Sequence, residues 1–65
     1  MAKIDLIQQE LNTKRINGQD KITIDQLHAV LLRHNILERW ERKAITQALE
    51  ARGVIRLEGS MLIIL

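Results

Sequence analysis

The sequence contains no cysteine and no proline, and its only aromatic residue is Trp40. Without cysteine, disulfides and thiolate metal ligands are excluded. The 65 residues allow one domain at most. A chain of that length is marginally stable, because it buries only about 60% of its unfolded surface. No apolar run is long enough for a signal peptide or a membrane span. We therefore expect one cytoplasmic domain over residues 1–65, with no membrane partner.

Recognisable catalytic groups are also missing. The two histidines, His28 and His34, are six positions apart and have no cysteine ligands to join them. No glycine-rich phosphate loop, nucleophile elbow or metal-ligand cluster is present. We therefore expect no enzyme, no cofactor and no metal site, and we expect both histidines to be structural or solvent-facing. The net charge of +2 permits a nucleic-acid partner without arguing for one.

Apolar periodicity predicts a first helix over residues 3–16. Ile4, Ile7 and Leu11 recur at helical spacing and form one stripe. Gly18 supplies the left-handed residue that ends a helix. Leu6 lies roughly opposite Ile4 on the helical wheel, so it is either an isolated surface leucine or part of a second contact face.

A short strand and a second helix follow. The β-branched run at 21–24 predicts a strand, and Thr23 with Gln26 forms the pattern of a capping box. The second helix is expected over 24–33. Its apolar residues cover most of its circumference, which predicts neighbours on two sides: Ile24, Leu27, Val30, Leu31 and Leu32.

A second capping-box pattern, Asn35 with Glu38, predicts a third helix over 36–52, which Gly53 ends. The connection between the second and third helices is then only two or three residues long. Such a short joint forces the two helices to cross steeply, as in a helix-turn-helix.

After Gly53 the pattern changes to two strand-like runs, 54–57 and 61–65, separated by a turn at 58–60. The last run is apolar throughout, which is typical of a central strand, so we expect it between the other two strands. The predicted fold class is α+β. Its order is helix-strand-helix-helix-strand-strand, with a three-stranded antiparallel sheet.

This order, ending in "ALEARGVIRLEGSMLIIL", resembles the winged-helix superfamily of helix-turn-helix proteins. In that family the third helix ends in a leucine and a glycine, and an apolar pair then opens a hairpin called the wing. Leu49, Gly53, Val54 and Ile55 fit this pattern. The resemblance implies that helix 36–52 enters the major groove of DNA.

On a helical wheel referenced to Leu37, the predicted inner face of helix 36–52 holds Ala44, Ala48, Ile45 and Leu49. The predicted DNA-binding stripe lies opposite and consists of Arg39, Arg42, Lys43, Thr46 and Gln47. Arginine can pair with guanine and glutamine with adenine, threonine can contact thymine, and lysine can bind phosphate. On the hairpin, Arg56 is expected on a phosphate, although Glu58 would repel one.

Two further residues of this helix, Glu41 and Trp40, each have two possible roles. Glu41 points toward the predicted inner face, where it either faces the free amides of the first turn, or pairs with a basic residue such as Arg33 or with a partner chain. Trp40 is interpreted as a half-buried lid over the core, or otherwise as a contact for a partner.

The outer face of the last strand is either covered by the first helix or open as an apolar patch. The candidate interface residues are Leu6, Trp40, Met61, Ile63 and Leu65.

Two functions from different classes remain. The first is a small protein that binds double-stranded DNA, either a transcriptional regulator or a component of a replication or partition assembly. One module makes few phosphate contacts, so we expect weak binding by a monomer and useful affinity only from a homodimer or larger assembly. The alternative is a winged-helix module that binds a partner protein and not DNA.

Overall fold

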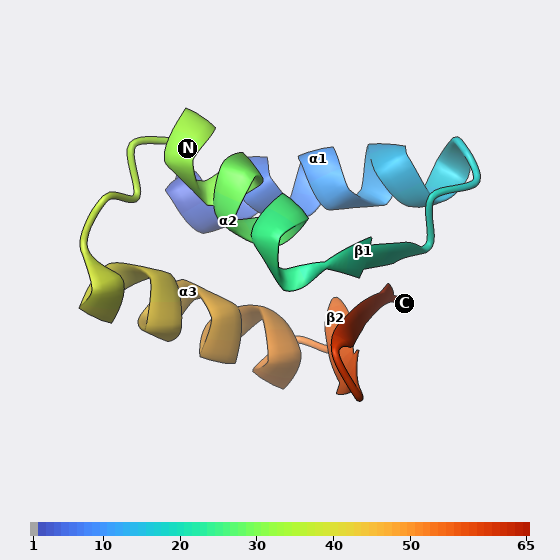
Figure 1. The fold of residues 1–65 in the computed structure, drawn as a ribbon. Helices are drawn as coiled ribbons and strands as arrows, with labels where there is room; N and C mark the ends of the chain where they lie inside the picture. The colour runs from blue at the N-terminus through green and yellow to red at the C-terminus, as the bar shows by residue number, and fades with distance from the viewer. Residues whose placement is uncertain (1) are drawn as a thin grey trace.

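The computed structural model describes residues 2–65 and contains three helices packed against a small sheet (Figure 1). The order helix-strand-helix-helix-strand-strand is the predicted one, and the fold class is α+β. The elements are α1 (Lys3–Ile16), β1 (Lys21–Thr23), α2 (Ile24–Arg33), α3 (Arg39–Ala51), β2 (Ile55–Glu58) and β3 (Met61–Ile64).

The three strands form one antiparallel sheet in the order β1-β3-β2. The prediction that the last, fully apolar strand is central is therefore confirmed. Gly59 and Ser60 form the two-residue turn of the β2–β3 hairpin, because Glu58 pairs with Met61. Gly59 has a φ of 63°, as the first position of a type II′ turn requires.

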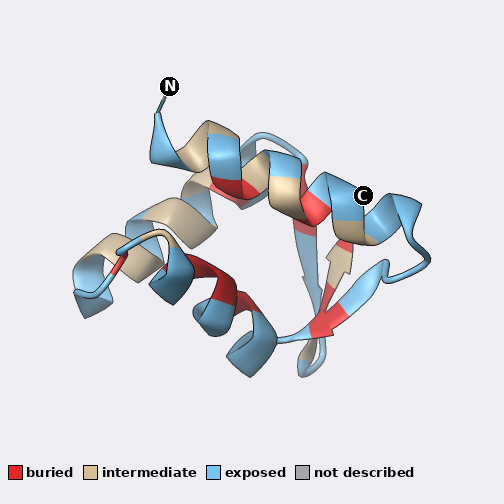
Figure 2. Cartoon of the chain, turned by 90° about the horizontal axis from the view of Figure 1, so that it is seen from above, coloured by how far each residue is buried: buried red, intermediate tan, exposed pale blue. Residues whose placement is uncertain are grey.

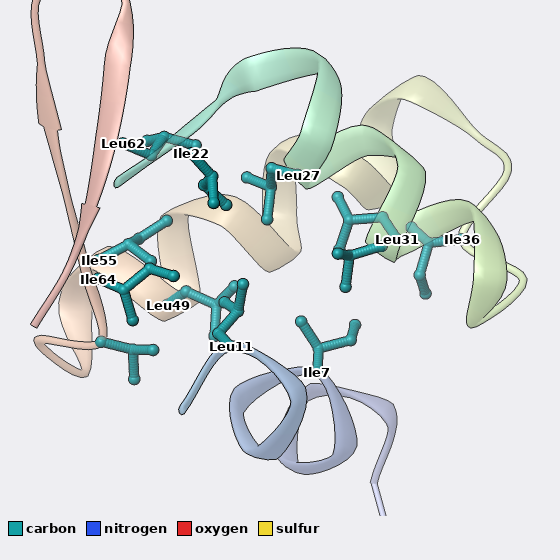
Figure 3. Close-up of a cluster of buried hydrophobic side chains, with 12 residues drawn as sticks. Ile7, Leu11, Ile22, Leu27, Leu31, Ile36, Leu49, Ile55, Leu62 and Ile64 are labelled. Atoms are coloured by element: carbon teal, nitrogen blue, oxygen red, sulfur yellow. The ribbon is translucent and has the colours of Figure 1, made fainter. Parts of the chain in front are cut away.

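A continuous aliphatic core fills the space between the helices and the inner face of the sheet (Figures 2 and 3). Leu62 and Ile64 reach it from β3, Ile7 and Leu11 from α1, and Leu49 from α3. No polar or charged residue of the described part of the chain is buried. Burial of aliphatic surface is thus the main source of stability.

All three helices end in the same hydrogen-bond pattern, a Schellman motif with one left-handed residue. The left-handed residues are Gly18, Asn35 and Gly53, with φ values of 90°, 61° and 73°. After α2, the Ile36 amide donates to the Leu31 carbonyl at 3.0 Å. The Ile36 side chain is buried beside Leu31 (Figure 3), which is the apolar contact expected for this motif.

The Schellman motif after α2 corrects the predicted start of the third helix. Asn35 ends α2 instead of capping α3, so the predicted second capping box does not form and α3 begins at Arg39. Glu38 occupies the N-cap position without a side-chain capping hydrogen bond. The connection therefore spans residues 34–38, which is longer than predicted. Figures 1 and 2 together nevertheless show α2 and α3 steeply inclined to each other and not antiparallel.

Helix α2 has the predicted bounds and the predicted capping box. The Gln26 amide donates to Thr23 Oγ1 at 3.1 Å, and the Thr23 amide donates to Gln26 Oε1 at 2.8 Å. The predicted burial on two sides was wrong. Leu27, Val30 and Leu31 are buried, but Ile24 and Leu32 are exposed, because neighbouring elements cover only one side of the helix.

Polar contacts join α1 to both other helices. Glu10 binds Arg33 and lies 3.1 Å from His34 Nε2 at the end of α2. Arg52 Nη1, just after α3, donates to Asp5 Oδ1 at 2.9 Å and to Gln8 Oε1 at 3.1 Å. Burial raises the pKa of Glu10, but hydrogen bonds and charge from Arg33 and His34 outweigh it and hold that pKa below its usual value.

Candidate nucleic-acid interface

Helix α3 is oriented by one fully buried residue, Leu49, and by Ile45, which packs partly against the core. At about 100° per residue, Trp40 lies half a turn from Leu49. Trp40 is accordingly 69% exposed, so its interpretation as a half-buried lid over the core was wrong. The opposite side of α3 from the core is thus centred on an aromatic side chain.

The predicted faces of this helix were rotated because the wheel was referenced to Leu37. Leu37 lies outside α3, in the connection, and is 59% exposed. Ala44, predicted to face inward, is exposed, whereas Arg42, predicted to face outward, is half-buried. Ile45 and Leu49 do face inward, as predicted.

A shallow groove between α2 and α3 collects the predicted stripe. The lining of this α2–α3 groove includes all five residues of the stripe, together with Glu50 from the same side of α3 and with His28, which the prediction did not include: His28, Arg39, Arg42, Lys43, Thr46, Gln47 and Glu50. His28 comes from α2 and is exposed. Helical spacing places Glu50 beside the stripe from sequence alone, but nothing in the sequence places His28 opposite α3. Five basic or polar side chains of α3 therefore share this groove with one carboxylate, that of Glu50.

Two of the five stripe residues have intramolecular partners. Arg42 Nη1 donates to the carbonyl of Leu37 at 3.0 Å, which fastens the connection to the first turn of α3. Thr46 Oγ1 donates to the carbonyl of Arg42 at 2.7 Å, within the helix. Arg39, Lys43 and Gln47 are exposed and are the stripe residues presented most directly to solvent.

The structure does not bring Arg56 to the α2–α3 groove. Arg56 pairs across the sheet with Ile63, on the face opposite to buried Leu62 and Ile64. Its Nη2 lies 3.0 Å from Glu58 Oε2, two residues along the same strand. The predicted phosphate contact would therefore require this ion pair to open and the hairpin to present its outer face.

The outer face of the last strand is not covered by the first helix. Met61 and Ile63 are half-buried there, and α1 packs on the opposite, inner face through Ile7 and Leu11. Across the sheet, Ile63 is flanked by Lys21 and Arg56, and Met61 by Thr23 and Glu58. The long polar stems beside the two apolar side chains reduce the area of the apolar patch.

The remaining predicted residues are placed as follows. Leu6 and Leu65 are exposed, as candidate interface residues must be. Glu41 is half-buried in the first turn of α3, where the helix dipole favours a carboxylate. Arg33 pairs with Glu10, so the alternative pairing of Glu41 with Arg33 does not form.

No protein-family model, curated protein or solved structure matches the chain. Within residues 2–65, no helix is long and apolar enough to cross a membrane. The same residues contain no group of three or more histidine, aspartate or glutamate side chains placed to hold a metal ion. The function is therefore argued from the geometry of α3 and its surroundings.

Proposed function

We propose that this protein is a cytoplasmic, winged-helix protein that binds double-stranded DNA through α3. The observation that carries the proposal is the α2–α3 groove, in which Arg39, Lys43 and Gln47 are exposed on one side of the second helix of a steeply crossed pair. The β2–β3 hairpin lies beside the C-terminal end of α3 (Figure 1), where a wing lies in the family that the sequence resembles.

Each exposed groove residue has a role in this proposal. Arg39 can fork onto the O6 and N7 atoms of guanine, and Gln47 can pair with the N6 and N7 atoms of adenine. Lys43 lies between them and can bind a phosphate, which fixes register without reading sequence. Arg42 positions the first turn through Leu37, and the methyl group of Thr46 can contact thymine.

The proposed binding is weak for a single copy. Two exposed cations in the groove release few counterions, and the carboxylate of Glu50 lies beside them. A homodimer or a partner protein that supplies a second module would raise the affinity by joining two sites. Transcriptional regulation and DNA attachment in a replication or partition assembly both use such paired modules.

A charge-reversal titration tests the proposal. Fluorescence anisotropy of a labelled random-sequence duplex at low salt should show binding by the natural protein. Arg39→Glu with Lys43→Glu should weaken it by at least about tenfold, and the slope of log affinity against log salt should fall by about one for the loss of the Lys43 phosphate contact.

The matched control is Lys3→Glu with Lys21→Glu. It changes the net charge by the same amount at two exposed residues that do not line the groove. The control should lose much less affinity. An equal loss in both variants, or no binding by the natural protein at low salt, overturns the assignment of α3 as the DNA-binding element.

The exposed Trp40 favours a second candidate, a module that binds a partner protein. Trp40 is 69% exposed, and Leu37, three positions earlier, is 59% exposed. Aromatic side chains of this kind are common centres of protein interfaces. Under this alternative, Trp40→Ala abolishes partner binding, while Arg39→Glu with Lys43→Glu leaves partner binding unchanged.

A further inference from the structure

The side of α3 directed away from the core carries a regular pattern. We define the outward face of α3 as Trp40, Ala44, Gln47 and Ala51, all of which are exposed. Their spacings of four, three and four residues are those of the a and d positions of a coiled coil. Relative to Leu49 these side chains lie within a narrow arc on the opposite side of the helix. A second helix can therefore pack along this face.

The sizes of the four side chains make the face complementary to itself in the antiparallel direction. With the helices antiparallel, Trp40 meets Ala51 of the second copy, and Ala44 meets its Gln47. Every layer then pairs a large side chain with a small one, as close packing requires. In the parallel direction Trp40 would meet Trp40, and the alanine layers would leave gaps.

The charges beside the outward face favour the same direction. Lys43 and Glu50 both lie on one flank and are exposed. In an antiparallel pair, equivalent flanks meet, so Lys43 comes opposite Glu50 of the second copy, and the two-fold axis repeats the pair. On the other flank Glu41 comes opposite Ala48, so no like charges are brought together.

We propose that α3 pairs with α3 of a second copy in an antiparallel, two-fold arrangement through its outward face. This inference does not depend on DNA binding. The pairing covers Gln47 and the side chain of Lys43, two of the exposed groove residues. The paired form and the proposed DNA complex therefore exclude each other, and a dimer that reads two DNA half-sites must form through another surface.

The expected association is weak. At 1.5 Å per residue, the outward face is about 17 Å long, and a single pair of short helices buries less than the roughly 1,200 Å² of a standard interface. We expect a dissociation constant of about 10 µM to 1 mM. The state of the protein then depends on its concentration, with the dimer formed where the chain is abundant.

Trp40 is the largest side chain of the proposed contact and the only tryptophan. Sedimentation equilibrium up to about 1 mM should show a rising mass, with Trp40 emission moving to shorter wavelength over the same range as the indole leaves water. Trp40→Ala should remain monomeric while its circular dichroism is unchanged. Leu32→Ala removes an exposed leucine of α2 and serves as the matched control. This control should associate as strongly as the natural protein.

A charge exchange tests the antiparallel register. Lys43→Glu alone and Glu50→Lys alone should each weaken association by about fivefold or more, because each creates two like-charge pairs. The double variant Lys43→Glu with Glu50→Lys should regain the association of the natural protein. A monomer at every concentration overturns the proposal, and so does a double variant that stays as weak as the single variants.

The DNA proposal fails by different results. Glu50→Lys adds a cation to the α2–α3 groove, so it should strengthen DNA binding while it weakens self-association. If Glu50→Lys loses self-association but still binds DNA, the antiparallel contact is supported. If this variant loses both activities, it is misfolded, which circular dichroism would detect. Absence of DNA binding with normal self-association would sink only the DNA proposal.

Discussion

Trp40 and Leu49 lie on opposite sides of α3: Trp40 is 69% exposed, and Leu49 has no exposed surface. The two residues should therefore differ sharply on truncation. Leu49→Ala should lower the free energy of unfolding by about 2–5 kcal/mol, because it leaves a cavity between α1, α3 and the sheet. Trp40→Ala should change it by less than about 0.5 kcal/mol, since the indole packs on little.

Urea unfolding followed by far-ultraviolet circular dichroism measures both effects. Because a domain of this size has little stability to lose, Leu49→Ala should be largely unfolded at room temperature without urea. A Trp40→Ala variant as unstable as Leu49→Ala would show that the indole packs against the core in solution.

Glu10 should make the free energy of unfolding depend on pH in the acidic range. Its pKa is lower in the folded state than in the unfolded chain, so its contribution to stability is present above the unfolded value. The contribution is lost as pH falls through the folded pKa, below the ordinary value of 4.5. Glu10→Gln should cost about 1 kcal/mol at neutral pH, and it should make unfolding less sensitive to acid in that window.

Urea midpoints measured from about pH 7 to about pH 3 follow this effect. Asp20→Asn is the matched control, because Asp20 is exposed and its side chain has no ion pair within residues 2–65. The control should keep the acid sensitivity of the natural protein. Parallel curves for Glu10→Gln and the natural protein would contradict the role of Glu10 at the α1–α2 contact.

Asn35 should be sensitive to substitution because of its backbone conformation. Its φ of 61° is left-handed, which a β-carbon disfavours and which asparagine tolerates better than alanine. Asn35→Ala should cost about 1 kcal/mol, whereas Asn35→Gly should be neutral or slightly stabilising. Asn17→Ala is the control, because Asn17 also follows a helix but has a φ of −82°.

Thermal unfolding of the three variants tests this expectation. Asn17→Ala should fall close to the natural protein. If Asn35→Gly were as unstable as Asn35→Ala, the asparagine side chain and not the backbone conformation would be stabilising the end of α2.

Local patterns predicted most of this fold. The bounds of α1 and α2 follow from apolar spacing and from the Thr23–Gln26 capping box, which involve residues close in sequence. The central position of β3 follows from its apolar run, because a strand without polar residues is typically one that has a neighbouring strand on each side. These features need no knowledge of distant contacts.

The start of α3 could not be predicted in the same way. Asn35 suits both the N-cap of a following helix and the left-handed end of a preceding one. Burial of Ile36 beside Leu31 selects the second role, and that contact depends on the packed core. The error rotated the predicted faces of α3, which misplaced Trp40 and Arg42.

The candidate site was predicted in composition but not in detail. Helical spacing brought Arg39, Lys43 and Gln47 together correctly, because that spacing is a property of one helix. The contribution of His28 and the turning of Arg56 away from the groove depend on how separate elements pack. Sequence spacing carries no information on such contacts.

Arg39 and Arg56 provide a direct comparison for the DNA proposal. Both are exposed arginines, but Arg39 lines the α2–α3 groove, whereas Arg56 lies on the outer face of the sheet and pairs with Glu58. Arg39→Ala should weaken DNA binding by about tenfold, since it removes a base or phosphate contact. Arg56→Ala should weaken it by less than about twofold, because Arg56 lies on the outer face of the sheet, does not line the groove and has Glu58 beside it. Anisotropy titrations of the two variants at one low salt concentration measure the difference. A larger loss for Arg56→Ala would mean that the hairpin, and not the groove, makes the principal contact with DNA.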